Sequence, residues 1–120
     1  MAVRAVRGAT HLSADDADEM RDAVVELVTA MLARNGLAPE DLIWVLFTAT
    51  PDLVSMFPAA AARFLDLADV PLICAQEIPV VGAMPRVVRV MALVESDLER
   101  RDVSHVYMRG AQALRVDLAQ

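Results

Sequence analysis

The centre of the chain holds an unbroken apolar run of strand length, LIWVLFTAT (42–50), which is rich in branched and aromatic residues. A run of this kind is typical of a β-strand that is covered on both faces. A second run, 86–96, alternates more clearly, and one of its faces consists of Val87, Arg89, Met91 and Leu93. With two such strands, the chain is predicted to build its core on a sheet.

Turn residues and apolar spacing define the other elements. Further strands are predicted over residues 2–10, 72–78 and 104–109. Apolar residues three and four apart predict a helix over 15–34, with Ser13 as its N-cap. Pro58 is predicted to begin a short second helix that continues through AAAARFLDLA (59–68). The order β-α-β-α-β-β-β predicts an α+β fold in which helices pack on one side of a mixed β-sheet. We expect a single domain over residues 1–120.

The apolar content predicts an interface with other subunits. Of the 120 residues, 57% are apolar, against about 45–50% in typical soluble domains by a count that includes Gly instead of Tyr. A core of this size cannot easily bury so many apolar side chains. An open sheet is therefore expected to cover its free face with copies of the same chain.

Three features predict a cytoplasmic protein without a membrane partner. Arg, Pro or Asp interrupts every apolar run well before the length of about 18 residues that a membrane span needs. The first residues lack the long apolar stretch of a secretory signal. The single cysteine, Cys74, excludes an internal disulfide and fits a reducing compartment.

All eleven basic residues are arginine, and the net charge is −6. The lack of lysine excludes Schiff-base chemistry, a P-loop lysine and a lysine general base. The acidic balance argues against a nucleic-acid partner. Each arginine ends in a planar guanidinium group, whose paired N–H donors suit carboxylates and phosphates. A cluster of arginines would therefore indicate a small anionic ligand.

Familiar catalytic motifs are missing from the sequence. There is no GxGxxG, P-loop, GxSxG or HExxH motif, and one cysteine with two histidines gives no zinc-site spacing, so no metal site is expected. Cys74 and His105 leave open a thiol–imidazole pair, although a lone cysteine in an apolar strand also fits ordinary packing.

The informative residues are polar groups in apolar settings. Arg89 lies mid-strand among valines, Glu77 lies at the end of an apolar strand, and Arg7 repeats the pattern in the first strand. Three interpretations stay open: an edge arginine that reaches solvent, a structural pair of Arg89 with Glu77, and a cavity that holds an anionic ligand. A pocket for a multiply charged carboxylate is suggested by four arginines, namely Arg7, Arg63, Arg89 and Arg115.

Several ordered motifs carry a resemblance to a known family. They extend from Val3 to Asp117 and comprise RGAT (7–10), TATPDL (48–53), FPA…R (57–63), C-x-Q-E (74–77), RV-M-x-x-V (89–94), HVY (105–107) and LRxDL (114–118). The sequence resembles the monofunctional trimeric chorismate mutases of the Bacillus type.

This resemblance implies a chorismate-mutase-like α+β subunit that assembles into a pseudo-barrel homotrimer, with active sites in clefts between subunits. It implies chorismate as the substrate and a Claisen rearrangement to prephenate as the reaction, a step toward phenylalanine and tyrosine. Such a pericyclic reaction needs no metal, coenzyme or covalent intermediate, so no cofactor is expected.

The resemblance also implies roles for individual residues. Arg89 would lie beside the ether oxygen of chorismate, Glu77 would accept a hydrogen bond from the ring hydroxyl, and Cys74 would contact the same end. Arg7 and Tyr107 would hold the side-chain carboxylate.

Other residues would complete the site. Phe57, Ala59 and Arg63 would come from the neighbouring subunit as the opposite wall. Leu114 and Arg115, in the C-terminal tail, would help to close the pocket.

One departure and two alternatives accompany the resemblance. Members of the family commonly have a lysine where this chain has Ala60, which predicts weaker substrate binding. The first alternative is a non-catalytic trimeric module that binds a small dicarboxylate, and the second is a trimeric imine deaminase with a similar subunit. The C-x-Q-E and TATPDL motifs favour the mutase.

Overall fold

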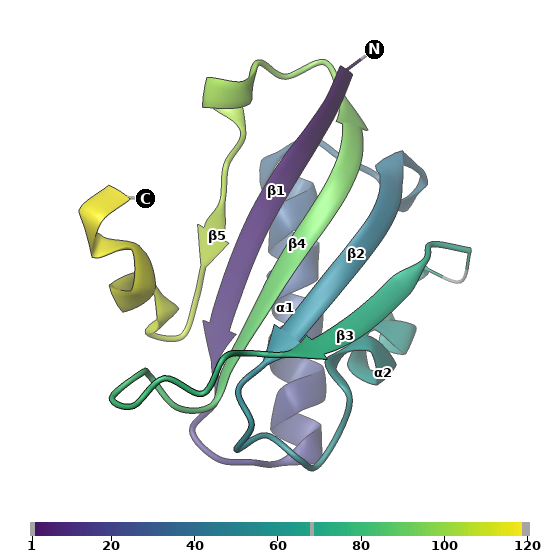
Figure 1. The fold of residues 1–120 in the computed structure, drawn as a ribbon. Coiled ribbons are helices and arrows are strands. Elements are labelled where there is room, and N and C mark those ends of the chain that lie inside the picture. The colour runs from purple at the N-terminus through teal and green to yellow at the C-terminus, as the bar shows by residue number, and fades with distance from the viewer. Residues whose placement is uncertain (1, 68, 119–120) are drawn as a thin grey trace.

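The computed structural model describes residues 2–67 and 69–118, with side chains up to Leu114. In this part of the chain, five strands and two α-helices follow the predicted order β-α-β-α-β-β-β (Figure 1). They are β1 (Ala2–His11), α1 (Ala17–Arg34), β2 (Leu42–Ala49), α2 (Pro58–Ala61), β3 (Leu72–Gln76), β4 (Val87–Ser96) and β5 (Val106–Tyr107). Short 3₁₀ segments cover Pro39–Asp41, Ala62–Phe64, Arg100–Asp102 and Ala111–Leu118.

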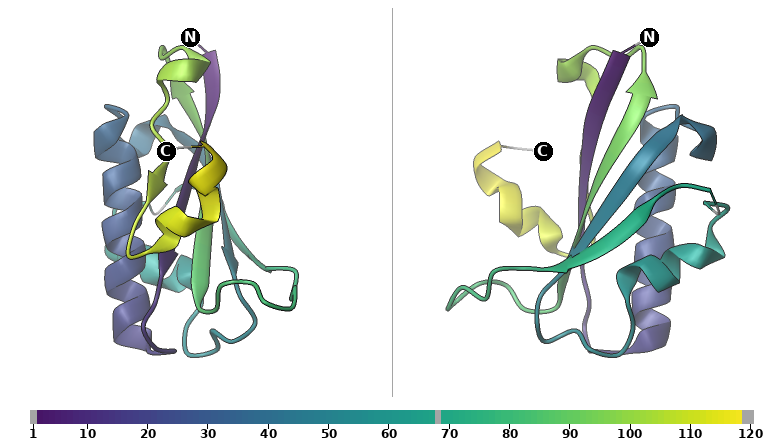
Figure 2. Two further views of the ribbon diagram at one scale, coloured as in Figure 1. Left: turned by 90° about the vertical axis from the view of Figure 1, so that its left-hand side faces the viewer. Right: turned by 45° about the vertical axis from the view of Figure 1, so that its right-hand side comes forward.

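The strands form a mixed sheet in the order β3-β2-β4-β1-β5. β4 is antiparallel to both β1 and β2, whereas β5 is parallel to β1 and β3 is parallel to β2. Both α-helices lie on the same face, and Figure 2 shows α1 running along the side of the sheet that is hidden in Figure 1. The predicted α+β fold, with helices on one side of a mixed sheet, is confirmed.

The core lies between α1 and the sheet. It is formed by the apolar side of α1 and by alternate residues of the strands, and the fully buried side chains include Met20, Val24, Leu27, Val45, Phe47 and Val88. β1 approaches the helix closely at Gly8, where a Cβ atom would lie 2.5 Å from the sulfur of Met31 and 3.1 Å from Cδ1 of Leu27. Glycine therefore allows the contact that places β1 against α1.

The start of α1 differs from the prediction. Asp16 is the N-cap in place of Ser13, because its carboxylate accepts the main-chain N–H of Glu19 at 2.9 Å. The Glu19 carboxylate accepts the main-chain N–H of Ser13 at 2.6 Å and the Ser13 hydroxyl at 2.8 Å. Asp16 and Glu19 have the three-residue spacing that joins an N-cap to the first helical turn, so Ser13 belongs to the preceding turn.

Three later elements are shorter than predicted. β3 covers Leu72–Gln76 instead of 72–78. α2 begins at Pro58 as expected, but the helical segment ends where Leu65 adopts an extended backbone, with φ −103° and ψ 157°. β5 covers Val106–Tyr107 instead of 104–109. Arg109 and Gly110 have positive φ angles of 54° and 91°, which turn the chain away from an extended course.

The sheet face away from the helices carries exposed apolar side chains, and it faces the viewer in Figure 1. Within this chain β2 is therefore covered on one side, since Phe47 is buried against the helices and Trp44 is 39% exposed. Val3 and Ile73, on β1 and β3, are 53% and 65% exposed. The β3–β4 connection projects on the same side (Figure 2). This open face holds the candidate site.

Candidate active site

A row of residues crosses the open face of the sheet. In the strand register, Arg89 of β4 lies between Thr48 of β2 and Ala9 of β1, and Ala9 is opposite Tyr107 of β5. The next row on the same face contains Leu46, Met91 and Arg7. Because side chains alternate along a strand, both rows project away from α1.

The two rows border a cavity of about 280 Å³, which we name the sheet pocket. It is lined by Arg7, Gly8, Ala9, Leu46, Thr48, Glu77, Arg89, Val90, Met91 and Tyr107. One chain therefore brings together four of the residues predicted for the site, and these are Arg7, Glu77, Arg89 and Tyr107.

Glu77 enters the sheet pocket from the end of β3. Its main-chain N–H donates to the carbonyl of Ala49 at 2.9 Å, which continues the pairing of β3 with β2 beyond the last strand residue. Its Oε1 atom lies 3.5 Å from Nε of Arg89, and its Oε2 atom accepts a hydrogen bond from the hydroxyl of Thr48. The Arg89–Glu77 pair that the sequence left as an alternative is thus formed.

This pair leaves Arg89 able to bind a second anion. The Arg89 side chain is 46% exposed, and among the described residues its only carboxylate contact is made through Nε. An ion pair as exposed as this one contributes little to stability. The Nη groups are left to donate charge-assisted hydrogen bonds to a ligand carboxylate or to a developing negative charge.

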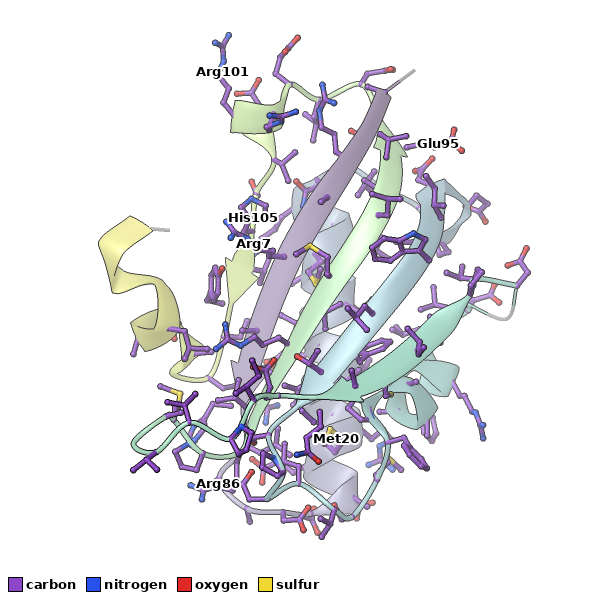
Figure 3. The ribbon with its side chains drawn as sticks, viewed as in Figure 1. Arg7, Met20, Arg86, Glu95, Arg101 and His105 are labelled. Atoms are coloured by element: carbon purple, nitrogen blue, oxygen red, sulfur yellow. The ribbon has the colours of Figure 1, made fainter. Side chains whose placement is uncertain are left out.

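Arg7 and Tyr107 lie on the other side of Arg89. Tyr107 is placed by the parallel pairing of β5 with β1, in which it lies opposite Ala9. The main-chain N–H of Arg7 donates to Nδ1 of His105 at 2.9 Å, and Figure 3 shows these two residues side by side between β1 and β5. The sheet pocket thus presents two guanidinium groups and a phenol beside one carboxylate, a set suited to an anionic ligand that also carries a hydroxyl.

A second group of predicted residues borders a different cavity, of about 890 Å³, between α2 and β3, which we name the α2 pocket. Its lining includes Phe57, Ala59, Ala60, Arg63 and Cys74. The resemblance assigned Phe57, Ala59 and Arg63 to a neighbouring subunit, so their separation from the sheet pocket was expected. Cys74 was instead predicted to contact the same end of the ligand as Glu77. Cys74 and Glu77 are three residues apart, so they project to opposite faces of the extended chain. The Cys74 sulfur accepts the main-chain N–H of Ala59 at 3.4 Å.

The sheet order bears on the predicted Cys74–His105 pair, whereas the predicted role of Leu114 and Arg115 is left untested. Cys74 lies on β3 and His105 immediately precedes β5, at opposite edges of the described sheet, so the thiol–imidazole pair does not form within one chain. Leu114 is half-buried in the 3₁₀ segment Ala111–Leu118, beside β5 in Figure 1. The side chain of Arg115 lies outside the described part of the chain, and the closing role of both residues stays a prediction.

Sequence reasoning assigned no site role to Thr48 and did not connect His105 with Arg7. For Thr48 a signal was present, because it is a polar residue that shares a face with Leu46 in the apolar run. For His105 there was none, since its contact depends on which strand lies beside β1.

Two further properties of the described residues concern a metal site and a membrane-spanning helix. No group of three or more His, Cys, Asp or Glu side chains in them is arranged to hold a metal ion. No helix among them is long and apolar enough to cross a membrane.

Comparisons with known proteins give the family. Residues 3–118 match the family model for chorismate mutase type I. The chorismate mutase AroH of Thermus thermophilus is 46% identical over 117 residues, which cover 97% of this chain and 96% of that protein. The chorismate mutase AroH of Bacillus subtilis strain 168 is 37% identical over 120 residues, which cover 99% of this chain and 94% of that protein. A solved structure of a chorismate mutase from Clostridium thermocellum has a TM-score of 0.89 and 40% identity, covering 91% of this chain and 97% of that one. With the fold and nearly the full length in agreement, this chain belongs to the chorismate mutase type I family.

Proposed function

We propose that the protein is a chorismate mutase, an isomerase that converts chorismate to prephenate by a Claisen rearrangement on the route to phenylalanine and tyrosine. The observation that carries the proposal is the sheet pocket, in which Arg89, paired with Glu77, lies with Arg7 and Tyr107 in a chain of this family. The reaction breaks a C–O bond and forms a C–C bond within one molecule. It therefore requires orientation and charge stabilisation, which these residues supply without a nucleophile.

Arg89 is assigned to the ether oxygen of the substrate, which gains negative charge as its bond to carbon breaks. At about 4 Å and an effective dielectric constant near 20, a full unit charge would be stabilised by roughly 4 kcal/mol, and a partial charge by proportionately less. This stabilisation raises the rate because the charge grows in the transition state. Glu77 holds the guanidinium through Nε, which leaves the Nη groups for the substrate.

Arg7 and Tyr107 are assigned to the side-chain carboxylate of chorismate. By holding that group they would keep the substrate in a folded, chair-like conformation in which the reacting carbons are close. Glu77 is assigned to the ring hydroxyl. Its carboxylate has about four lone-pair sites, so it can accept from a substrate hydroxyl in addition to Thr48 and Arg89.

A second subunit of a homotrimer is proposed to complete the site. Within one chain the α2 pocket is separate from the sheet pocket, and Phe57 at its border is 74% exposed. The exposed Trp44 and Ile73 on the open face also favour burial against another copy. If the α2 pocket of one subunit meets the sheet pocket of the next, Ala59, Arg63 and the Cys74 region form the opposite wall.

The proposed homotrimer has consequences for the closure of the cleft and for the mass of the particle, and a cytoplasmic location is proposed with it. The tail residues Leu114 and Arg115 would close the cleft between subunits. A particle with three times the chain mass of 13.0 kDa is expected in light scattering. The free thiol of Cys74 is consistent with a cytoplasmic location.

The direct test adds purified protein to chorismate, follows the ultraviolet absorbance and identifies the product. Saturable conversion to prephenate, with no metal or coenzyme added, is the expected result. Saturable binding without turnover, by protein shown to be folded, would contradict the proposal and favour the non-catalytic binding module.

A further inference from the structure

The main chain of Arg7 is held at the sheet edge by a side chain. Its N–H donates to Nδ1 of His105 at 2.9 Å, a contact between residues 98 positions apart in the sequence. β5 pairs with β1 first at Gly8 and Val106, so Arg7 lies one residue outside the ladder. The imidazole nitrogen takes the place of a strand carbonyl at the point where the ladder begins.

This contact restrains β1 at the root of the Arg7 side chain. A ring nitrogen that accepts a hydrogen bond carries no proton, so neutral His105 has its proton on Nε2. At the adjacent residue, Gly8, a Cβ atom would lie 2.5 Å from the sulfur of Met31, so β1 also abuts α1. The strand is thus restrained at its edge and on its inner face directly beside Arg7.

His105 is not a wall of the sheet pocket. It borders an adjacent cavity of about 500 Å³, together with Arg4 and Arg100. Arg7 and Met91 border both cavities, and of these two residues Arg7 is the one whose main-chain N–H donates to His105. An effect of His105 on the reaction would therefore pass through Arg7.

We propose that His105 is a positioning residue, whose Nδ1 fixes the backbone of Arg7 so that the guanidinium meets the substrate carboxylate. The inference rests on the proposed function. The carboxylate keeps its charge throughout the rearrangement, so poor placement of Arg7 weakens substrate binding more than it slows the bound substrate.

The test compares two substitutions of His105 at one fixed pH. His105→Asn keeps an acceptor oxygen near the position of Nδ1, whereas His105→Leu removes the acceptor at similar size. His105→Leu is expected to raise KM for chorismate about 5–10-fold, as for the loss of one hydrogen bond, with kcat within about threefold of wild type. His105→Asn is expected to keep KM within about twofold of wild type, since the acceptor is retained. His11→Leu, at the last residue of β1 and outside the lining of both cavities, is the matched control and should change neither constant.

A double substitution tests whether the effect passes through Arg7. In an Arg7→Ala background, His105→Leu is expected to add nothing to KM, because no guanidinium remains to be positioned. Additive effects would overturn the proposal, and so would an equal rise of KM in the His105→Leu and His105→Asn variants.

A measurement on the wild-type protein avoids any dependence on how the variants fold. The imidazole ¹⁵N chemical shifts are expected to place the proton of neutral His105 on Nε2, and a proton on Nδ1 would overturn the proposal. Wild-type protein without turnover would overturn the proposed function as well. Active wild-type protein, with KM unchanged in His105→Leu, would overturn this inference alone.

Discussion

Nε of Arg89, in β4, lies 3.5 Å from Oε1 of Glu77, which directly follows β3, although β2 lies between β3 and β4 in the sheet. Thr48 of β2 is opposite Arg89 in the register and donates to the other oxygen of the same carboxylate. Residues from three neighbouring strands therefore hold one carboxylate–guanidinium unit, and the direction of the Arg89 side chain depends on all three.

Replacing Arg89 with Lys keeps the positive charge but removes the planar guanidinium group. A single ammonium group cannot pair with Glu77 and also donate to the substrate as separate Nε and Nη groups do. We expect kcat for chorismate at saturating substrate to fall about 10²–10³-fold, as when one oxyanion donor is lost. Arg101→Lys, in the exposed 3₁₀ segment Arg100–Asp102 and outside the lining of the sheet pocket (Figure 3), should keep normal activity. A near-normal kcat for Arg89→Lys would contradict the placement of Arg89 at the ether oxygen.

Thr48→Val tests whether the hydroxyl that contacts Glu77 matters to the reaction. Valine has nearly the same shape but cannot donate, so Glu77 would lose a hydrogen bond and be free to turn toward Arg89. We expect kcat/KM to fall about tenfold or more, since a hydrogen bond to a charged group is lost. Thr48→Ser keeps the hydroxyl and should stay within a few-fold of wild type. Equal activities of the two variants would show that the contact is dispensable.

Alternation along strands predicted much of this site. Period-two spacing placed Arg89 with Met91 on one face of β4, and the structure places that face on the open side of the sheet. The same rule assigns Cys74 and Glu77, three residues apart, to opposite faces, contrary to the shared contact that was expected of them. Cys74 accordingly borders the α2 pocket.

Sheet order and register could not be predicted from local patterns. The pairing of β4 with β2 brings Thr48 beside Arg89, and the short parallel pairing of β5 with β1 brings His105 to Arg7. Both depend on contacts between segments far apart in the sequence. The start of α1 was misplaced for a local reason, because several residues before the helix can act as caps and Asp16 has the better spacing from Glu19.

Ala60→Lys tests the departure from the family pattern. Ala60 borders the α2 pocket beside Arg63, so a lysine there would add a second cation for an anionic substrate. We expect KM for chorismate to fall several-fold with little change in kcat, because the added charge acts on a carboxylate that is present throughout the reaction. Ala14→Lys adds the same charge in the exposed turn before α1 and serves as the control. An unchanged KM in Ala60→Lys would show that alanine at this position costs no affinity.

Glu19 makes stability depend on pH. The main-chain N–H of Ser13, the Ser13 hydroxyl, the N–H of Ala14 and the charge of Arg109 hold the pKa of the Glu19 carboxyl below its usual value of 4.5. Ionised Glu19 therefore stabilises the folded state. This contribution is fully present above about pH 4.5 and is lost as the pH falls through the lowered folded-state pKa.

Glu19→Gln should reveal that contribution in thermal or urea unfolding. At pH 7 we expect a loss of no more than about 1 kcal/mol in the free energy of unfolding, since the half-buried Glu19 carboxylate lies at the surface, where water weakens charge interactions. The difference from wild type should shrink as the pH falls below about 4.5. Glu95→Gln, at an exposed position of β4 (Figure 3), should show a smaller loss at pH 7. A difference between wild type and Glu19→Gln that is independent of pH would contradict the assigned role of the charge.

Mixing two inactive variants tests whether the active site lies between subunits. Arg89→Ala removes a cation from the sheet pocket and Arg63→Ala removes one from the α2 pocket, so each pure variant should have little activity. When the two are unfolded and refolded together, a site is intact wherever the sheet pocket of an Arg63→Ala subunit meets the α2 pocket of an Arg89→Ala subunit. Random assembly of a closed ring makes this about one site in four, so activity should return to about a quarter of the wild-type value. If both arginines instead served one site within a single chain, every site would carry one substitution, and the mixture would be as inactive as its components.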